Sequence, residues 1–338
     1  MPLRKKRVTM MVHADLVPPD DPGELTDAQR LEVRTELDVL AALRDLGHEV
    51  RAQGVSDDLK PLREHLEAFR PHVVMNLLEE FRSNTMLDHN VIAYLELLRI
   101  PYTGCNPRGL ILARDKGLSK KVVTHHRVAA PRFAVFRKRR KIKRPPRLSF
   151  PLIVKSLTED ASLGISQASI VHNDEKLIER VQFMHRSIDS HAIVEQFIDG
   201  REIYVTVLGH ERLRVFPPWE LVFEDPRPDA PLIATRSAKW DEKFIERRGV
   251  VVKPAELEPA LAEALVRCSK RVYRALNLSG YARVDYRVRN DGKIFFLEAN
   301  PNPDICRNSE AAGGAESAGL DYGQFIDQLL RLGLRSLD

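Results

Sequence analysis

Short apolar runs alternate with helical patterns along the first third of the chain. Residues Val8 to Val12 and His72 to Leu78 are mostly apolar and predict two strands. Residues 34–50 and 85–100 carry apolar side chains at helical spacing and predict two helices, the first ended by Gly47. Such alternation of strands and helices is typical of a parallel sheet. No G-x-G-x-x-G occurs in this stretch, so a dinucleotide site has no support.

The rest of the chain is richer in strand patterns and divides into two further units. We expect an N-terminal α/β unit over residues 1–113, a smaller α+β unit over 114–194 and a second α+β unit over 195–338. Residues 217–244, rich in proline and charge, predict a long, mobile loop. Strands are expected within 132–136, 151–157, 167–172, 192–198 and 201–209, and helices within 173–187, 257–277 and 322–334.

The composition is that of a soluble globular protein. Hydrophobic residues make up 43% of the 338 positions and charged residues 30%. The three cysteines are too few and too dispersed for a disulfide framework or a zinc cluster, which favours a reducing cytoplasm. His13 and Asp15 interrupt the apolar part of the first segment, so we expect no signal peptide. No stretch approaches the length of a membrane span.

The net charge of +5 originates in one tract. Residues 137–147, RKRRKIKRPPR, hold eight basic side chains and no acidic one, whereas elsewhere 45 basic residues face 48 acidic ones. Basic runs are most often solvated loops. Contact with nucleic acid or another anionic partner is the functional alternative. Aromatic residues do not alternate with these charges, so nucleic-acid binding is not expected.

Oxygen-bearing side chains interrupt a predicted β-hairpin near the end of the chain. Its two strands flank residues 290–292, Asn-Asp-Gly, which is a strong turn signal. Asp285 shares a strand face with Arg283, and Glu298 shares one with Asn300, because side chains alternate along a strand. If the two faces coincide, the carboxylate and amide oxygens converge as Mg²⁺ requires. A solvated face explains Asp285 alone, but the whole set favours a metal site.

Two lysines follow patterns suited to phosphate. Lys155 ends an apolar strand and precedes a loop, residues 156–164, with small hydroxyl side chains and a glycine. A point charge beside backbone N–H groups suits phosphate recognition. Lys116 stands at the start of a predicted helix. Taken alone, Lys155 is better explained as a snorkelling side chain and Lys116 as a solvated one.

Two glutamates flank a linker between predicted strands. Glu195 lies in the first strand and Glu202 begins the second. A hinge of this kind offers backbone hydrogen bonds to a flat base and a carboxylate to ribose hydroxyls. A surface turn at Asp199-Gly200 explains either glutamate alone equally well.

Together these motifs resemble the ATP-grasp superfamily, and within it the D-alanine–D-alanine ligase-like branch. The resemblance lies in the order of the motifs over nearly the whole chain. It also lies in spacings: seven residues from Glu195 to Glu202, thirteen from Asp285 to Glu298, and two from there to Asn300. Each motif alone is weak, whereas the ordered set is specific. The resemblance implies an ATP-grasp fold, with an N-terminal parallel-sheet α/β domain and two α+β lobes that clamp ATP.

The resemblance also implies a role for each motif residue. ATP and Mg²⁺ would be the cofactors, with two metal ions expected and Mn²⁺ as an alternative. The implied nucleotide-binding residues are Lys116, Lys155, Glu159, Ser162, Glu195, Gln196, Phe197, Ile198 and Glu202. The implied metal ligands are Asp285, Glu298 and Asn300. The implied catalytic residues are Arg283 at the oxyanion, Lys239 at the γ-phosphate, Ser162 in the closing loop and Ser309 beside the second substrate's carboxylate.

The implied reaction joins a carboxylate to an amine. The carboxylate attacks the γ-phosphate of ATP, and a closed loop protects the acyl phosphate from water. The amine then attacks, which gives an amide, ADP and phosphate. Amino acids or short peptides are the expected substrates, a homodimer is the expected assembly, and the cytoplasm is the expected location.

The sequence departs from the family at the substrate end. The early Ser-Glu motif that holds the first amino group is missing, and Glu32 and Glu36 are candidate replacements. The phosphate loop has residues 160–162, Asp-Ala-Ser, in place of paired serines after glycine. Trp240 replaces a tyrosine, and Asp304 replaces a glycine beside the oxyanion site. These departures predict a substrate other than two D-alanines.

Other interpretations stay open. Within enzymes, the alternative is D-alanine–D-alanine ligase itself. Outside enzymes, it is an ATP-binding or regulatory module that has lost ligation. Retention of Arg283 and Lys239 argues against that loss, because a protein that only binds ATP needs no oxyanion arginine. A nucleic-acid-binding protein rests on the basic tract alone.

Overall fold

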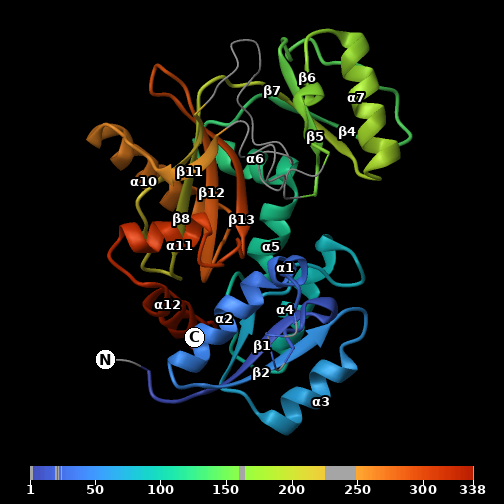
Figure 1. Cartoon of the computed structure of the whole chain (residues 1–338). Coiled ribbons are helices and arrows are strands. Elements are labelled where there is room, and N and C mark those ends of the chain that lie inside the picture. Colours follow the sequence, from blue (N-terminus) through green and yellow to red (C-terminus); the bar gives the residue numbers. More distant parts are fainter. Residues whose placement is uncertain are drawn as a thin grey trace.

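The computed structural model describes residues 3–19, 21, 23, 25–159, 164–224 and 249–337. Figure 1 shows an N-terminal unit below and two further units above it, each built around a sheet of its own. This mixed architecture confirms the expected fold class, a parallel-sheet domain followed by two α+β lobes. None of the helices in the described ranges is both long and apolar enough to cross a membrane.

The N-terminal unit holds three parallel strands in the order β2-β1-β3. The central strand is buried over its five inner residues, and the predicted parallel sheet is confirmed. The strand β2 escaped prediction because it lies at the edge of the sheet, half exposed and without clear alternation. The strands are β1 (Arg7–His13), β2 (Glu49–Val55) and β3 (Val73–Asn76). Around them lie η1 (Ala14–Leu16), α1 (Asp27–Glu32), α2 (Arg34–Asp45), α3 (Lys60–Phe69), η3 (Thr85–Leu87) and α4 (Asp88–Leu97).

The middle unit is a four-stranded antiparallel sheet covered by one helix. Its strand order is β4-β7-β5-β6, so β4 is an edge strand. The helix α7 (Asp174–Ser187) buries Leu177, Val181 and Met184 at helical spacing. Asn173 caps it by accepting a hydrogen bond from the Lys176 N–H. The strands are β4 (Phe133–Phe136), β5 (Leu152–Ser156), β6 (Ile170–Val171) and β7 (Ala192–Gln196), with η4 (Gln167–Ser169) before β6.

The third unit is a larger sheet with strand order β11-β10-β8-β12-β13, and β9 pairs with β8. The helix α10 (Pro259–Ala275) packs against one face, whereas Arg283 and Asp285 project from the other. The prediction of a continuous loop over residues 217–244 was wrong for Trp219–Phe223. These residues form β10 because Leu221 and Phe223 are buried against β8. The strands are β8 (Arg201–Leu208), β9 (Arg214–Val215), β10 (Trp219–Phe223), β11 (Val250–Pro254), β12 (Tyr281–Val288) and β13 (Ile294–Pro301).

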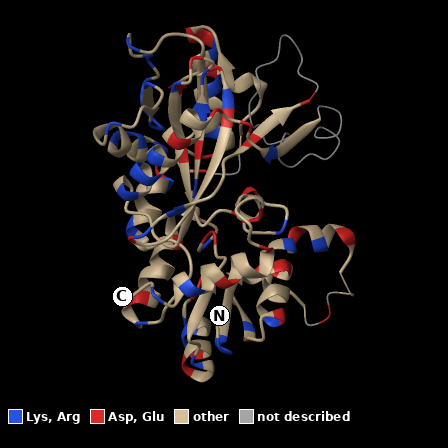
Figure 2. Cartoon of the chain, turned by 90° about the vertical axis from the view of Figure 1, so that its left-hand side faces the viewer, with Lys and Arg blue, Asp and Glu red and all other residues tan. Residues whose placement is uncertain are grey.

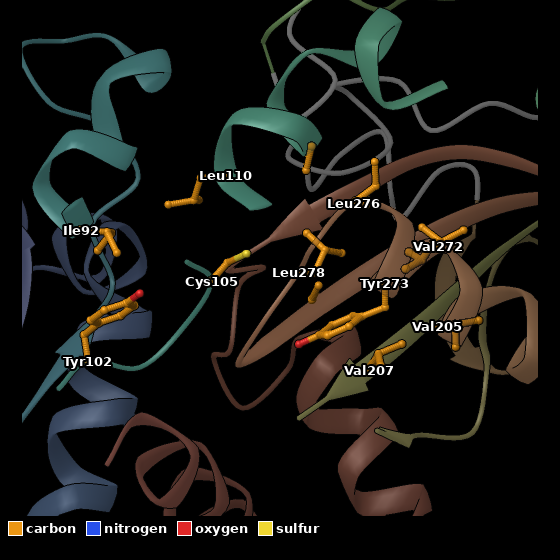
Figure 3. Packing of buried hydrophobic residues seen from close by; sticks show 14 of the residues in the cluster. Ile92, Tyr102, Cys105, Leu110, Val205, Val207, Val272, Tyr273, Leu276 and Leu278 are labelled. Atoms are coloured by element: carbon orange, nitrogen blue, oxygen red, sulfur yellow. The ribbon is translucent and has the colours of Figure 1, made fainter. Parts of the chain in front are cut away.

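One apolar core joins the first and third units. The helices α5 (Pro107–Arg114) and α6 (Lys116–His125) connect the units and pack against β13. Figure 3 shows side chains from β8 and α10 meeting those of the segment around α5 and, beyond it, of the first unit. The labelled members of this core are Ile92, Tyr102, Cys105, Leu110, Val205, Val207, Val272, Tyr273, Leu276 and Leu278. The sheet is therefore rigidly supported behind its polar face.

The last helix returns to the first unit. The helix α11 (Glu310–Ser317) lies against the large sheet, and α12 (Tyr322–Gly333) packs against α2 and β3. Ile326 and Leu329 share a buried cluster with Val8 and Leu43, which are more than 280 positions earlier in the chain. The boundaries expected at residues 113 and 194 stay predictions, but this cluster shows that the first unit is completed by the end of the chain.

Candidate functional site

The hairpin β12–β13 brings the candidate metal ligands together. Asp285 lies directly opposite Glu298, and Arg283 lies directly opposite Asn300. The Asn300 Nδ2 donates to Asp285 Oδ2 at 3.1 Å. The turn of the hairpin passes through Gly292, whose φ of 79° suits glycine. A register shift between Asp285 and Tyr286 then places Asp285 opposite Glu298 and not opposite Leu297. The sequence-based expectation that these four side chains share one face therefore agrees with the geometry.

Arg283 is held between two carboxylates. Its Nε and Nη2 donate to the two oxygens of Asp285 at 2.8 and 3.0 Å, and its Nη1 donates to Glu310 Oε2 at 3.0 Å. Burial alone would lower the pKa of Arg283, but Asp285 and Glu310 raise it well above its usual value, so it stays charged. A guanidinium has five N–H groups. Two of them have no acceptor among the described residues and are available to an oxyanion.

The donor set on the hairpin fits Mg²⁺. No group of three or more His, Cys, Asp and Glu side chains is arranged for a metal in the described ranges. The hairpin instead offers two carboxylates and one amide oxygen on adjacent, rigid strands. Mg²⁺ takes few protein ligands, chiefly one or two carboxylates, and completes its octahedron with phosphate and water. Asp285, Glu298 and Asn300 supply that number and type of oxygen.

A buried lysine that sequence reasoning missed lies beneath the cleft. Lys120 is fully buried, with its Nζ 3.1 Å from Glu195 Oε1, and it donates to the backbone oxygen of Leu297. Its Nζ also lies 5.4 Å from the ring centroid of Phe296. It thereby links β7 of the middle unit to β13 of the large sheet. The available signal was its position four residues after Lys116, which places both lysines on one face of α6.

Glu195 lies between two lysines. Its second oxygen is 3.6 Å from Lys155 Nζ, and its side chain is almost fully buried. Burial alone would raise the pKa of Glu195, but the charges of Lys120 and Lys155 outweigh it and hold the pKa below its usual value. Burial lowers the pKa of Lys120, against the opposing effect of Glu195. The carboxylate thus lies between two lysine ammonium groups, and the contact of Glu195 with adenine that the resemblance implies stays a prediction.

Lys116 connects the helix start to two predicted site residues. Asp115 caps α6, and the Lys116 Nζ lies 3.4 Å from Glu298 Oε2. The same Nζ donates to the backbone oxygen of Glu159 at 2.8 Å. Lys116 therefore bridges the hairpin that carries the candidate metal ligands and the start of the loop expected to cover phosphate. Ser162 of that loop, Lys239 and Trp240 lie outside the described residues.

A cleft lies between the middle sheet and the large sheet. The N–H groups of Gln196 and Phe197 already donate to the carbonyls of Arg132 and Pro151. Of the three linker residues, Ile198 alone has an N–H without an acceptor in the described part of the chain. The lining residues are Pro131, Ile153, Lys155, Ile165, Glu195, Gln196, Phe197, Ile198, Glu202, Asp285, Arg287, Leu297 and Glu298.

Glu202 lines the same cleft and is oriented by two neighbours. Its Oε2 lies 2.9 Å from Arg287 Nη2, and its Oε1 accepts from the Tyr204 hydroxyl at 3.0 Å. Arg287 also donates to the Gly200 carbonyl at 2.7 Å, which fixes the turn before β8. A carboxylate held in this way presents its remaining lone pairs in a defined direction.

Ser309 and Glu310 begin the helix α11. The Ser309 hydroxyl is the N-cap and accepts from the Ala312 N–H at 3.2 Å, so its first role is structural. Glu310, which sequence reasoning did not single out, follows it and pairs with Arg283. Negative charge in the first turn of a helix is also favoured by the helix dipole.

The candidate replacements for the missing Ser-Glu motif differ in environment. Glu32 is exposed, whereas Glu36 is only 4% exposed and pairs with no described side chain. Burial, together with the charges of Glu79 and Asp304, raises the pKa of Glu36 to about 7. Asp304 accepts from Thr35 Oγ1 at 2.9 Å and lies 3.6 Å from Arg34, so it ties β13's loop to α2.

A nucleotide cleft between two α+β lobes, backed by paired lysines and an oxygen-rich hairpin, defines the class of ATP-grasp enzymes. A family model described as "D-ala D-ala ligase C-terminus" matches residues 122–331, and the chain belongs to this family. The protein is accordingly an ATP-dependent carboxylate–amine ligase.

Curated relatives extend over most of the chain. A D-alanine–D-alanine ligase from Desulfotalea psychrophila is 32% identical over 255 residues, covering 73% of this chain and 74% of the relative. Another from Syntrophotalea carbinolica is 30% identical and covers 91% and 93%. An uncharacterised protein, y4sG, from Sinorhizobium fredii is 34% identical over 301 residues, covering 86% and 85%.

Solved structures share the fold. The D-alanine–D-alanine ligase from Bacillus anthracis, in a structure with ATP, superposes with a TM-score of 0.75 at 21% identity and covers 98% of both chains. The VanG D-Ala:D-Ser ligase from Enterococcus faecalis gives a TM-score of 0.72 at 18% identity, covering 98% of this chain and all of that one.

Proposed function

We propose that the chain forms an amide bond between a carboxylate and an amine through an acyl phosphate, with release of ADP and phosphate. The observation that carries this proposal is the hairpin arrangement of Arg283 beside Asp285, Glu298 and Asn300. Two adjacent cross-strand pairs thus supply oxygen atoms suited to a metal ion and a guanidinium suited to a developing oxyanion. A protein that only binds nucleotide has no need of the second feature.

The nucleotide is proposed to lie along the cleft between the sheets. The Ile198 N–H donates to the adenine ring, and Glu202 accepts from a ribose hydroxyl. Lys155 and Lys116 contact the phosphates, where Lys116 is already directed by Glu298 and Glu159. Each contact uses a group that the fold has oriented before the substrate arrives, which reduces the reorganisation that binding requires.

Asp285, Glu298 and Asn300 are proposed to hold Mg²⁺, and two ions are expected. Bound Mg²⁺ would neutralise phosphate charge and orient the γ-phosphate. The substrate carboxylate attacks that phosphate, and the amine then attacks the carbonyl of the acyl phosphate. Arg283 donates its two remaining N–H groups to the oxyanion that this second attack creates. The amine loses a proton, and the carbon–oxygen bond to phosphate breaks.

The substrate pair is proposed to differ from two D-alanines. Relatives bear the name D-alanine–D-alanine ligase, which makes that activity the second candidate. Glu36 and Asp304 stand at the substrate end, and Glu310 adds a carboxylate beside Arg283. We place the ammonium group of an amino-acid-like substrate at Glu36. Amino acids or short peptides, a cytoplasmic location and a homodimer complete the proposal.

The test is ADP release by the purified protein with Mg²⁺-ATP and paired acids and amines. Amino acids of both hands, short peptides and simple carboxylates form the panel. ADP release that needs both partners and is lost in Glu298→Ala would support ligation. The matched control is Asp291→Ala, an exposed carboxylate at the turn of the same hairpin.

Two outcomes separate the remaining candidates. Efficient synthesis of D-alanyl-D-alanine would overturn the proposed substrate difference and leave the ligase assignment intact. ATP binding without ADP release for any pair would be followed by hydroxylamine, which intercepts acyl phosphates. If hydroxylamine elicits no ADP release with any acid, the chemical step proposed here is refuted for that panel.

A further inference from the structure

The basic tract, residues 137–147, separates into two sets of side chains. The first set fixes the tract to the middle unit. Lys138 pairs with Asp189, and Arg144 donates to Asp174 at 2.7 Å and to the Leu148 carbonyl at 2.6 Å. The Arg144 guanidinium also lies 4.7 Å from the ring centroid of Phe150. The tract is therefore anchored near both ends, which is unlike a freely solvated loop.

The second set surrounds a pocket. Arg137, Arg140, Lys141 and Lys143 line a hollow of ≈ 260 Å³, many times the ~30 Å³ that one water occupies in the liquid. None of the four has an ion pair or side-chain hydrogen bond with any described residue. No acidic residue contributes to the lining, whose other members are Ala134, Val135, Phe136 and Pro145.

This pocket is separate from the nucleotide cleft. The two share no lining residue. Both border β4, but at opposite ends: Phe133 pairs with Glu195 at the cleft, whereas Phe136 pairs with Ala192. Outside the tract, 45 basic residues face 48 acidic ones, and Figure 2 shows blue and red segments along the helices and strands of the other units. A hollow lined by one sign of charge departs from this balance.

The charges of this pocket define its ligand. Four cations around one hollow repel one another, and a multivalent anion removes that repulsion. Arginine binds phosphate oxygens with two parallel N–H groups and lysine binds them as a point charge, so two arginines and two lysines suit at least two phosphate groups. Phe136, the one aromatic residue of the lining, is buried, so no exposed aromatic platform is offered to unstacked bases. A compact anion fits better than a nucleic-acid strand.

We propose that the basic pocket formed by β4 and residues 137–145 binds a compact anion carrying two or more phosphate groups. Two sources share this chemistry, inorganic polyphosphate and the phosphate tail of a nucleotide. The binding site is independent of the ligase reaction, since none of its residues reaches the cleft.

Calorimetric titration at low ionic strength tests the proposal, with inorganic tripolyphosphate in one arm and ADP in the other. The pocket variant is Arg140→Ser/Lys141→Ser. The matched control is Lys176→Ser/Arg186→Ser, which removes two exposed charges from α7 of the same unit. We expect a binding event that wild type and control share and that weakens at least tenfold in the pocket variant.

The two titrations distinguish an inorganic from a nucleotide ligand, and the controls show whether a loss of binding is specific to the pocket. Because the cleft is proposed to bind nucleotide as well, only binding that the pocket variant loses is assigned to the pocket. A loss confined to tripolyphosphate indicates an inorganic ligand, whereas a matching loss of an ADP-binding event indicates a nucleotide; either supports the pocket. Unchanged ADP release and circular dichroism show that the pocket variant is folded. The proposal is overturned if all three proteins bind tripolyphosphate equally, or if only single-stranded nucleic acid binds.

Discussion

The molecule has two clusters of positive charge, and they are built in opposite ways. In the cleft, every described cation is paired with an internal carboxylate. These pairs are Lys116 with Glu298, Lys120 and Lys155 with Glu195, Arg283 with Asp285 and Glu310, and Arg287 with Glu202. In the basic pocket, four cations lie together without an acid.

The difference shows what each cluster can do. Paired, buried cations are fixed in position, so they can direct a reaction, but their removal leaves a buried carboxylate uncompensated. Unpaired, exposed cations attract an anion by charge alone, so salt weakens that attraction. Removal of one such side chain changes the stability of the protein little. Variants in the cleft should therefore affect chemistry and stability, whereas variants in the basic pocket should affect only anion binding.

The largest effect is expected from Asp285→Asn. This change keeps the shape of the side chain but removes the charge that orients Arg283 and serves the proposed metal site. Loss of one electrostatic group at a reacting centre typically lowers kcat by about 10² to 10³. The measurement is ADP release with the substrate pair found by the panel, with Asp291→Asn as control. Full activity in the Asp285 variant would contradict the assigned role.

The next effect is on stability, at Lys120. Lys120→Met leaves Glu195 buried with one partner fewer, and breaking a buried pair typically costs about 3–5 kcal/mol. Urea unfolding measures this change. Adding Glu195→Gln to the same protein removes the uncompensated charge and is expected to restore most of the loss. A double variant no more stable than Lys120→Met would show that packing, and not charge pairing, sets the cost.

A pH dependence is expected from Glu36. Its pKa is raised from 4.5 to about 7, chiefly by burial. Between these values the folded protein binds a proton that the unfolded chain releases, so the free energy of unfolding falls as pH rises and is constant above. Glu36→Gln should lose this dependence and exceed wild type in stability at about pH 8. Exposed Glu32→Gln is the control, and identical pH profiles for wild type and Glu36→Gln would refute the shift.

The smallest effect is expected in the basic pocket. Arg140→Ser/Lys141→Ser removes two unpaired, like charges, so urea unfolding at low salt should change by no more than about 0.5 kcal/mol. Any change should diminish at high salt, because screening weakens the repulsion that is removed. A loss of several kcal/mol would show that these side chains are structural and would remove the contrast with the cleft.

Local sequence patterns predicted many helices and strands, because nearby residues determine where these elements form. The hairpin followed from a turn at residues 290–292 and from the alternation of apolar and polar positions. The pairing of Asp285 with Glu298 also depends on a register shift between Asp285 and Tyr286, which alternation alone does not predict. The site residues that escaped prediction depend on distant contacts. Lys120 acquires its role from Glu195 and Leu297, and neither the periodicity of α6 nor its charge shows this.

The surroundings of Asp304, at the candidate substrate-binding end, also depend on long-range contacts. The hydrogen bond from Thr35 to Asp304 joins residues 269 positions apart, so the sequence showed an added anion but not the helix to which it is tied. The strand β10 escaped for a similar reason. The prolines and charges on either side of it suggested a loop, whereas pairing with β8 and β11 stabilises it as a strand.

Because α12 packs against the first unit, the protein cannot be divided freely into separately expressed fragments. The segment that matches the family model, residues 122–331, is a unit of similarity and not of folding. Expressed as a fragment, it would expose the face of α12 that carries Ile326 and Leu329, and the complementary fragment would lack cover over Val8 and Leu43. Two such fragments should aggregate alone and recover solubility when coexpressed. A chimera that exchanges the ATP-grasp lobes between relatives would thus need to take the first unit and α12 from the same protein.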